Sequence, residues 1–182
     1  PVRSGLALYR EGQALAPIAA SPAAPMALFA WPYEDLRPTV QALPAGALIR
    51  AVAGPLYRGD LEQKTYPLYV MYTAETNCPA ALCPSQPLAD FGGEFQLLSA
   101  ATQPQLAGMR LELVWRAARP DGAPHQGFAQ AWVGDQIMAQ ADSALGTTLY
   151  PSEWWRPGET VWEAHDFAWP DKKIAVFLDL EA

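Results

Sequence analysis

Residues 150–159 constrain the fold of this chain more than any other stretch of its sequence. They read Tyr-Pro-Ser-Glu-Trp-Trp-Arg-Pro-Gly-Glu and lead directly into a strand-like stretch at 160–167. Pro157 fixes φ near the value that the second position of a tight turn requires, and Gly158 accepts the positive φ of the third position. The segment is therefore predicted to be a turn at the end of a β-sheet, with two large aromatic side chains beside it.

Alternation of apolar and polar residues runs through the second half of the chain. Residues 109–117 show it most clearly, because every second residue from Met109 to Trp115 is apolar and, apart from Val114, the residues between them are charged. A period of two with one solvated face is typical of antiparallel strands. Further strands are predicted at 95–101, 127–133, 136–141, 160–167 and 174–180, and strand candidates in the first half are 6–10, 27–31, 48–53 and 66–73.

Many short strands separated by turn residues predict an all-β protein, built as an antiparallel β-sandwich of the jelly-roll or immunoglobulin-like type. One short helix is expected within residues 34–43. The natural boundary in the chain is 74–90, a loop-like stretch that holds both cysteines and several prolines. Residues 1–90 form an N-terminal β-rich part, either a separate domain or part of the same sandwich, and residues 91–182 form the sandwich module.

Composition excludes several classes of partner. The chain has 182 residues, is 51% hydrophobic and carries a formal net charge of -7, so it can bury a core and has an acidic surface. Binding to nucleic acid or to anionic lipid is not expected, because both need clustered Lys and Arg. The apolar stretch 15–31 is interrupted by prolines and is too broken to form a membrane helix. Because the sequence begins at Pro1, we expect it to be a piece of a longer protein.

The two cysteines, Cys78 and Cys83, are close in sequence and each is followed by proline. A disulfide that closes this small loop is the leading interpretation, and it implies an oxidising, extracytoplasmic compartment. Two thiolates without further ligands fall short of a zinc site, and their spacing differs from that of a Cys-x-x-Cys redox pair. The alternative is two free thiols.

Residues 91–182 also carry a series of motifs in a recognisable order. They are Phe-Gly at 91–92, Leu-x-Leu-x-Trp at 111–115, a Phe-led strand at 128–133, Gly-Asp at 134–135, Ala-Gln-Ala-Asp at 139–142 and Tyr-Pro-Ser-x-x-Trp-x-Pro-Gly-Glu at 150–159. This series resembles a β-sandwich module at the C-terminus of large bacterial membrane glycosyltransferases of the dolichyl-phosphate-mannose protein mannosyltransferase type. Residues 1–90 do not share the resemblance.

The resemblance implies a soluble, extracytoplasmic accessory domain attached to an upstream membrane domain. Such a domain would position a glycan or a glycosylated acceptor, or contact a protein, and would do no chemistry itself. The catalytic carboxylates of these transferases lie between membrane helices, so no catalytic residue and no cofactor is expected in this chain. The alternative is a stand-alone carbohydrate-binding or cell-surface interaction module. The oligomeric state is left open.

A cluster of tryptophans near the turn is the candidate ligand site. Sugar rings stack on flat aromatic faces, and carboxylates accept hydrogen bonds from sugar hydroxyls. The residues that would form such a platform are Trp154, Trp155, Trp169, Glu153, Glu159 and Asp171. The competing interpretation is that these aromatic rings pack in the core, as large aromatics usually do. Trp155 is the better candidate for packing and Trp154 for exposure.

The two histidines offer weaker candidates. His165 shares a strand face with Glu163, which allows contact between them, and Asp166 is adjacent. One histidine with one carboxylate is an incomplete metal site, so no metal is predicted and a solvent-facing or structural role for His165 is favoured. His125 lies in a Gly-Ala-Pro-His loop and is expected to be exposed. The acidic pair Glu34-Asp35 is read as ordinary surface charge, because nothing in the sequence marks a glycosidase cleft.

Overall fold

Strands dominate the protein. The computed structural model describes residues 25–58, 65–106, 108–133, 135–168 and 175–181. Within these residues the helical part is limited to α1 (Leu36–Gln41) and the 3-10 turn η1 (Ser152–Trp154). The predicted all-β class and the predicted short helix are therefore confirmed. The strand candidate at 6–10 lies outside the described residues.

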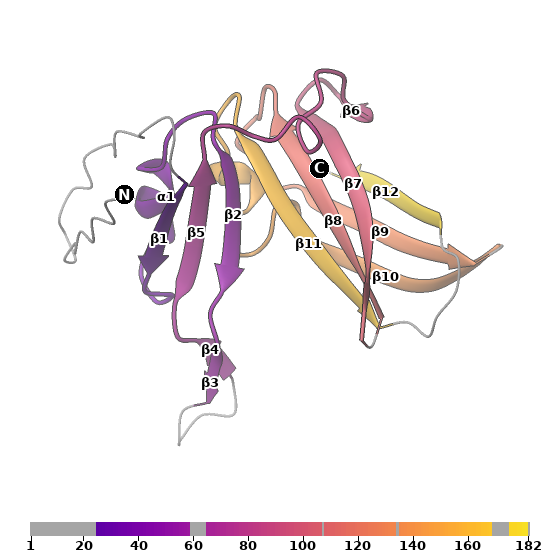
Figure 1. Ribbon diagram of the computed structural model, residues 1–182, viewed down its shortest axis with the longest axis horizontal. Helices are drawn as coiled ribbons and strands as arrows, with labels where there is room; N and C mark the ends of the chain where they lie inside the picture. The colour runs from indigo at the N-terminus through magenta and orange to yellow at the C-terminus, as the bar shows by residue number, and fades with distance from the viewer. Residues whose placement is uncertain (1–24, 59–64, 107, 134, 169–174, 182) are drawn as a thin grey trace.

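The described strands form one large sheet, one small sheet and a hairpin (Figure 1). The large sheet has the spatial order β1 (Met26–Ala30), β5 (Val70–Glu75), β2 (Leu48–Ala53), β11 (Thr160–Ala168), β8 (Gly108–Ala117), β7 (Phe95–Gln105) and β6 (Ala89–Phe91). The small sheet has the order β10 (Gln136–Ala144), β9 (Gln126–Val133) and β12 (Ala175–Glu181). The hairpin consists of β3 (Leu56–Arg58) and β4 (Thr65–Pro67) and projects beyond β2 and β5.

The middle of the large sheet joins the two halves of the chain. Strand β11 pairs with β8 in antiparallel fashion on one side and with β2 in parallel on the other. The parallel contact is short and aligns Leu48 with Thr160. Strands from residues before 90 and after 90 thus share one hydrogen-bonded sheet, and the turn at 156–159 lies where β11 enters it.

The predicted strand at 66–73 is divided in the structure. Pro67 belongs to β4, which pairs with the short strand β3, whereas β5 begins at Val70 and pairs with β1 and β2. Backbone pairing nevertheless continues between the two strand pairs in the same register, because the N–H of Gly54 donates to the carbonyl of Tyr69 at 2.8 Å and the N–H of Leu68 to the carbonyl of Pro55 at 2.9 Å.

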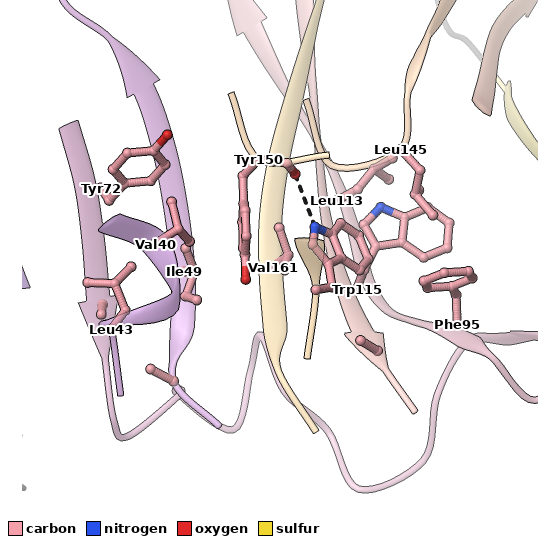
Figure 2. Packing of buried hydrophobic residues seen from close by; sticks show 14 of the residues in the cluster. Val40, Leu43, Ile49, Tyr72, Phe95, Leu113, Trp115, Leu145, Tyr150 and Val161 are labelled. Atoms are coloured by element: carbon pink, nitrogen blue, oxygen red, sulfur yellow. Dashed lines mark hydrogen bonds between the residues drawn. The ribbon is translucent and has the colours of Figure 1, made fainter. Parts of the chain in front are cut away.

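The main hydrophobic core lies on one face of the large sheet. Figure 2 shows its largest members, among them Tyr72, Phe95, Trp115 and Tyr150. Alanines of the small sheet, Ala129 among them, belong to the same cluster, so the small sheet packs on this face. Buried apolar area of this kind is the main source of stability in a β-protein.

A second, smaller cluster lies on the opposite face and explains why Val114 interrupts the alternation of its strand. Val114 packs with Leu48 and Leu98, and the disulfide loop covers these side chains. Cys78 and Cys83 are bonded to each other, as predicted. Val114 is therefore apolar because the loop buries its face of β8 at this point. In the part of the chain that the structure describes, no helix has the length and apolarity needed to cross a bilayer.

Candidate functional site

The turn between η1 and β11 has the conformation that its sequence predicts. Gly158 has φ of 83°, and the N–H of Glu159 donates to the carbonyl of Arg156 at 3.1 Å. The N–H of Gly158 donates to the carbonyl of Ala117 at 2.7 Å, which fixes the turn to the end of β8. Proline at the second position and glycine at the third supply the dihedral angles that this turn needs.

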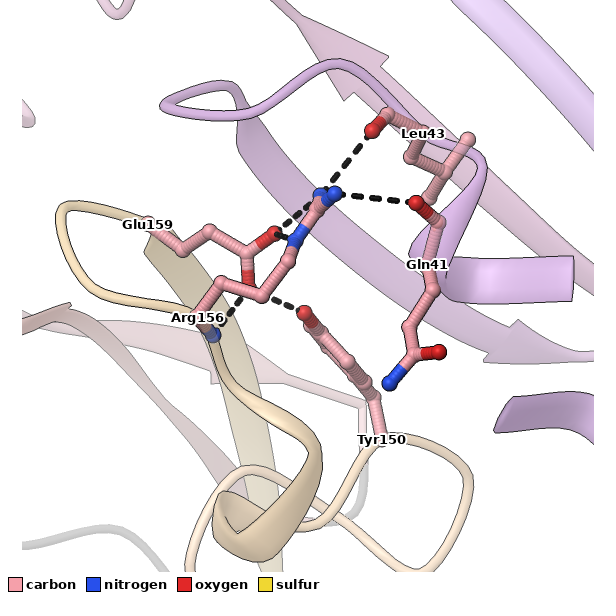
Figure 3. A network of polar contacts seen from close by, with 5 residues as sticks. All are labelled: Gln41, Leu43, Tyr150, Arg156 and Glu159. Carbon is pink, nitrogen blue, oxygen red and sulfur yellow. Dashed lines mark hydrogen bonds and ion pairs between the residues drawn. The ribbon is translucent and has the colours of Figure 1, made fainter. Parts of the chain in front are cut away.

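Glu159 is completely buried at the centre of a polar network. Its carboxylate accepts hydrogen bonds from the Tyr150 hydroxyl, from the Arg156 backbone N–H at 2.8 Å and from the Arg156 guanidinium (Figure 3). The same guanidinium donates to the carbonyls of Gln41 and Leu43, each at 2.9 Å. The network therefore ties the turn to the chain that leaves α1, more than a hundred residues earlier in sequence.

Burial keeps the Tyr150 hydroxyl protonated, so that it acts as a hydrogen-bond donor. Desolvation, with the negative charge of Glu159 as a smaller cause, raises the pKa of the Tyr150 hydroxyl far above its ordinary value. Tyr72 is buried as well, its pKa is raised by desolvation, and its hydroxyl donates to the carbonyl of Leu149 at 2.8 Å. Both tyrosines remain neutral and hold the irregular segment between β10 and β11 in place.

Trp155 belongs to the core, which agrees with the packing interpretation of this residue. Its side chain is 4% exposed, its indole N–H donates to the carbonyl of Tyr150 at 3.0 Å, and its ring meets Phe95 edge-on. The surface role predicted for Trp155 and Glu159 does not fit these positions, because neither side chain faces solvent. The burial of Trp155 was the favoured interpretation, whereas the burial of Glu159 depends on contacts with distant residues that the turn motif does not show.

The other members of the predicted platform are not gathered around these two residues. Trp154 and Glu153 lie in η1 and are partly exposed, with Trp154 packed against the margin of the core. Trp169 and Asp171 lie outside the described residues. The described part of the chain therefore brings only Trp154 and Glu153 together near the surface.

Glu163 and His165 share a face of β11, as their spacing predicts. His165 Nε2 lies 3.3 Å from Glu163 Oε1. However, the buried Glu163 carboxylate also accepts the indole N–H of Trp115 at 2.9 Å and the backbone N–H of Gly146 at 2.6 Å. This carboxylate satisfies buried donors, so Glu163 has a structural role.

Asp166 is on the opposite face of β11 and is not part of that group. It forms a bidentate ion pair with Arg110 of β8, with distances of 2.7 and 2.8 Å. Hydrogen bonding from the guanidinium holds the pKa of the Asp166 carboxyl below its usual value. Since both side chains are substantially exposed, the pair contributes little to stability.

The expectation that His125 is exposed is wrong. The residue is 7% exposed, and its ring packs edge-on against Phe95 at a centroid distance of 4.9 Å. Its backbone N–H donates to Ser152 Oγ at 3.0 Å. The glycine and proline before His125 suggested a solvated loop, but Phe95 packs against the ring and Ser152 of η1 binds the backbone of the loop.

A surface rich in aromatic side chains, which the sequence patterns did not predict, lies around β1. Phe29, Trp31 and Tyr33 are each more than half exposed. Their rings contact one another or neighbouring tyrosines, with centroid distances of 5.3 Å for Phe29–Tyr69, 5.4 Å for Trp31–Tyr33 and 5.7 Å for Tyr33–Tyr66. We call these five residues the aromatic surface. The signal in the sequence was the occurrence of three aromatic residues within five positions, of which Phe29 lies in β1 and Tyr33 in the turn that follows.

The paired acids next to this surface have a local role. Asp35 precedes α1 and accepts the backbone N–H of Arg37 at 3.0 Å, so it is the N-cap of that helix. Glu34 is exposed.

Comparison of the chain with models of protein families, with curated proteins and with solved structures finds no match.

Proposed function

We propose that this chain is a non-catalytic, extracytoplasmic accessory domain of a membrane glycosyltransferase, folded as a β-sandwich of the jelly-roll or immunoglobulin-like type. The main support is that the polar side chains of the turn signature stabilise the fold itself. Glu159, Arg156 and Tyr150 bind one another and the backbone at the end of α1, so their polar groups are engaged in holding the domain together. A motif with this role is typical of a structural domain.

The packing of the two sheets supports the sandwich. The small sheet lies on one face of the large sheet and shares its core, which is the arrangement of a two-layer β-protein. The disulfide between Cys78 and Cys83 supports an oxidising compartment. Glycan or acceptor positioning, or contact with a protein, is then the role left to such a domain.

The size and membrane partitioning of the native protein test this proposal. An antibody raised against residues 91–182 would be used to follow the protein through carbonate, high-salt and detergent extraction of cells. The expected result is a species much larger than 182 residues that only detergent releases, and that transfers sugar when purified. A species of about the mass of this chain that is released without detergent would overturn the assignment.

The alternative, a carbohydrate-binding module, is favoured by one specific observation, the aromatic surface. Trp31 and Tyr33 expose 55% and 59% of their area, which is unusual for side chains whose burial would stabilise the fold. Exposed rings offer flat apolar faces to the C–H groups of a sugar, and the exposed Glu34 next to Tyr33 offers a carboxylate that accepts hydrogen bonds from sugar hydroxyls. This ligand would suit either a stand-alone module or the accessory domain.

Replacing Trp31 by alanine is expected to weaken binding to a polysaccharide about 10-fold, which corresponds to about 1.4 kcal/mol. Affinity electrophoresis of the domain in gels containing mannan, galactan or glucan measures the retardation, and Tyr33→Ala should have a similar effect. Leu88→Ala is the control, since Leu88 is 64% exposed but outside the aromatic surface. Equal retardation of all three variants, or none for the wild type, would contradict glycan binding at these rings.

A further inference from the structure

Three potential metal ligands meet at one end of the large sheet. Glu94 lies in the turn between β6 and β7, and Asp121 and His125 lie in the loop between β8 and β9. One carboxylate oxygen of each acid and one ring nitrogen of the histidine lie within 4.8 Å of one another. The two segments are more than twenty residues apart in sequence, so the set is created by the fold.

The histidine of this set is held rigidly. His125 is buried against Phe95, its backbone N–H donates to Ser152 Oγ, and its carbonyl accepts the N–H of Leu145 at 2.9 Å. Its Nε2 atom lies 3.0 Å from Asp121 Oδ1. A buried ring fixed on several sides and facing two carboxylates is a preorganised nitrogen ligand.

The two acids are positioned by backbone hydrogen bonds. Asp121 Oδ1 accepts the N–H of Ala123 at 2.9 Å, which orients the carboxylate within its loop. The carbonyl of Glu94 accepts the N–H groups of Ala118 and Arg119, at 2.8 and 3.1 Å, so the β6–β7 turn is joined to the start of the same loop. The Glu94 side chain is partly exposed and has room to adjust.

The cationic side chain of Arg119, in the same loop, contacts groups outside this set. Arg119 Nε donates to the carbonyl of Gly93 at 3.2 Å. Among the residues that the structure describes, Arg119 forms no ion pair with Glu94 or Asp121. The two carboxylates of the set are therefore available to balance the charge of a divalent ion.

We propose that Glu94, Asp121 and His125 bind a divalent transition-metal ion, with zinc as the best match. Zinc accepts one imidazole nitrogen together with carboxylate oxygens, whereas calcium and magnesium prefer oxygen ligands alone. Bonds of about 2.0 to 2.1 Å in tetrahedral geometry place ligand atoms roughly 3.3 Å apart. The His125 and Asp121 atoms are already close to that separation, and a small shift of the Glu94 carboxylate completes three ligands. A water molecule would take the fourth position.

The bound ion would clamp the β6–β7 turn to the β8–β9 loop. A ligand that binds only the folded state raises stability in proportion to the logarithm of its concentration. The proposal is independent of the function proposed above, because it concerns a different part of the surface and neither sugar transfer nor glycan binding.

Zinc titration of the chain, after treatment with EDTA and removal of the chelator, tests the proposal. Isothermal titration calorimetry is expected to show one equivalent bound, and the melting temperature is expected to rise with zinc but not with magnesium. Glu94→Gln and Asp121→Asn each remove one anionic ligand with little change in shape, and should weaken zinc binding at least 10-fold. Glu75→Gln is the matched control, since Glu75 is a partly exposed acid on β5.

The side-chain nitrogen resonances of the two histidines identify the ligand directly. Zinc should shift Nε2 of His125 and leave His165 unchanged. The proposal is overturned if wild-type protein binds no zinc, if Glu94→Gln and Asp121→Asn bind it as tightly as Glu75→Gln, or if the shift appears at His165. Tighter binding of calcium than of zinc would likewise overturn the assignment of metal class.

Discussion

Replacing Glu159 by alanine is expected to lower the free energy of unfolding by about 3 to 5 kcal/mol. The carboxylate is fully buried and accepts hydrogen bonds from Tyr150, from the Arg156 backbone and from the Arg156 guanidinium. Its removal leaves a hydroxyl and a backbone N–H without their acceptor and a largely covered guanidinium without its counter-charge. Each of these losses is costly in a low-dielectric interior.

Urea unfolding followed by tryptophan fluorescence measures this effect. The control is Asp166→Ala, which breaks a bidentate ion pair with Arg110 that is open to solvent. Exposed pairs contribute about 0 to 1 kcal/mol, so the control should lose at most that much. Tyr150→Phe removes one hydrogen bond to the buried carboxylate and should fall between the two, at about 1.5 to 3 kcal/mol. Equal losses for Glu159→Ala and Asp166→Ala would mean that the Glu159 network does not stabilise the fold.

Features that depend on neighbouring residues were predictable from the sequence. The Pro157–Gly158 turn follows from the dihedral preferences of two residues, and the strand β8 follows from its period of two. The disulfide closes a loop of a few residues, so proximity in sequence was enough to suggest it. Each of these predictions needed only local information, and the structure confirms each.

Features that depend on distant partners were not predictable in this way. The role of Glu159 is set by an arginine that also binds Gln41 and Leu43, and the sequence gives no sign of that contact. His125 is buried against Phe95, a residue of another strand, and its backbone is held by Ser152 of η1. The same limit applies to Glu94, whose proposed partners lie in a different loop.

The parallel contact between β2 and β11 shows the same limit for topology. An alternating pattern indicates a strand and its buried face, but says nothing about which strand lies beside it. The Glu159 network supports this pairing, because it joins Arg156, which lies just before β11, to Gln41 at the end of α1 and to Leu43 before β2. The turn motif thus matters for stability through contacts that its own sequence does not reveal.

Gly146→Ala is expected to lower the free energy of unfolding by about 2 to 5 kcal/mol, from two sources that add. Gly146 has φ of 94°, a value that costs an L-residue about 1 to 2 kcal/mol. An added Cβ would also lie 2.4 Å from Trp155 Cζ2 and 2.5 Å from the Tyr150 carbonyl oxygen. Neither group can move freely, because the indole is buried and hydrogen-bonded to that same carbonyl. Overpacking of this kind costs about 1 to 3 kcal/mol.

Gly158→Ala separates the two sources. Gly158 has a similar φ of 83°, but a Cβ there would have nothing within 4 Å, so only the backbone cost of about 1 to 2 kcal/mol should appear. Thermal and urea unfolding measure both variants, and near-ultraviolet circular dichroism reports on the packing of Trp155. Gly146→Ala should be the less stable variant and should alone change the near-ultraviolet spectrum. Equal stability of the two variants with unchanged spectra would mean that the ring of Trp155 moves aside with no loss of stability. The segment between β10 and β11 would then be packed less tightly than its buried contacts indicate.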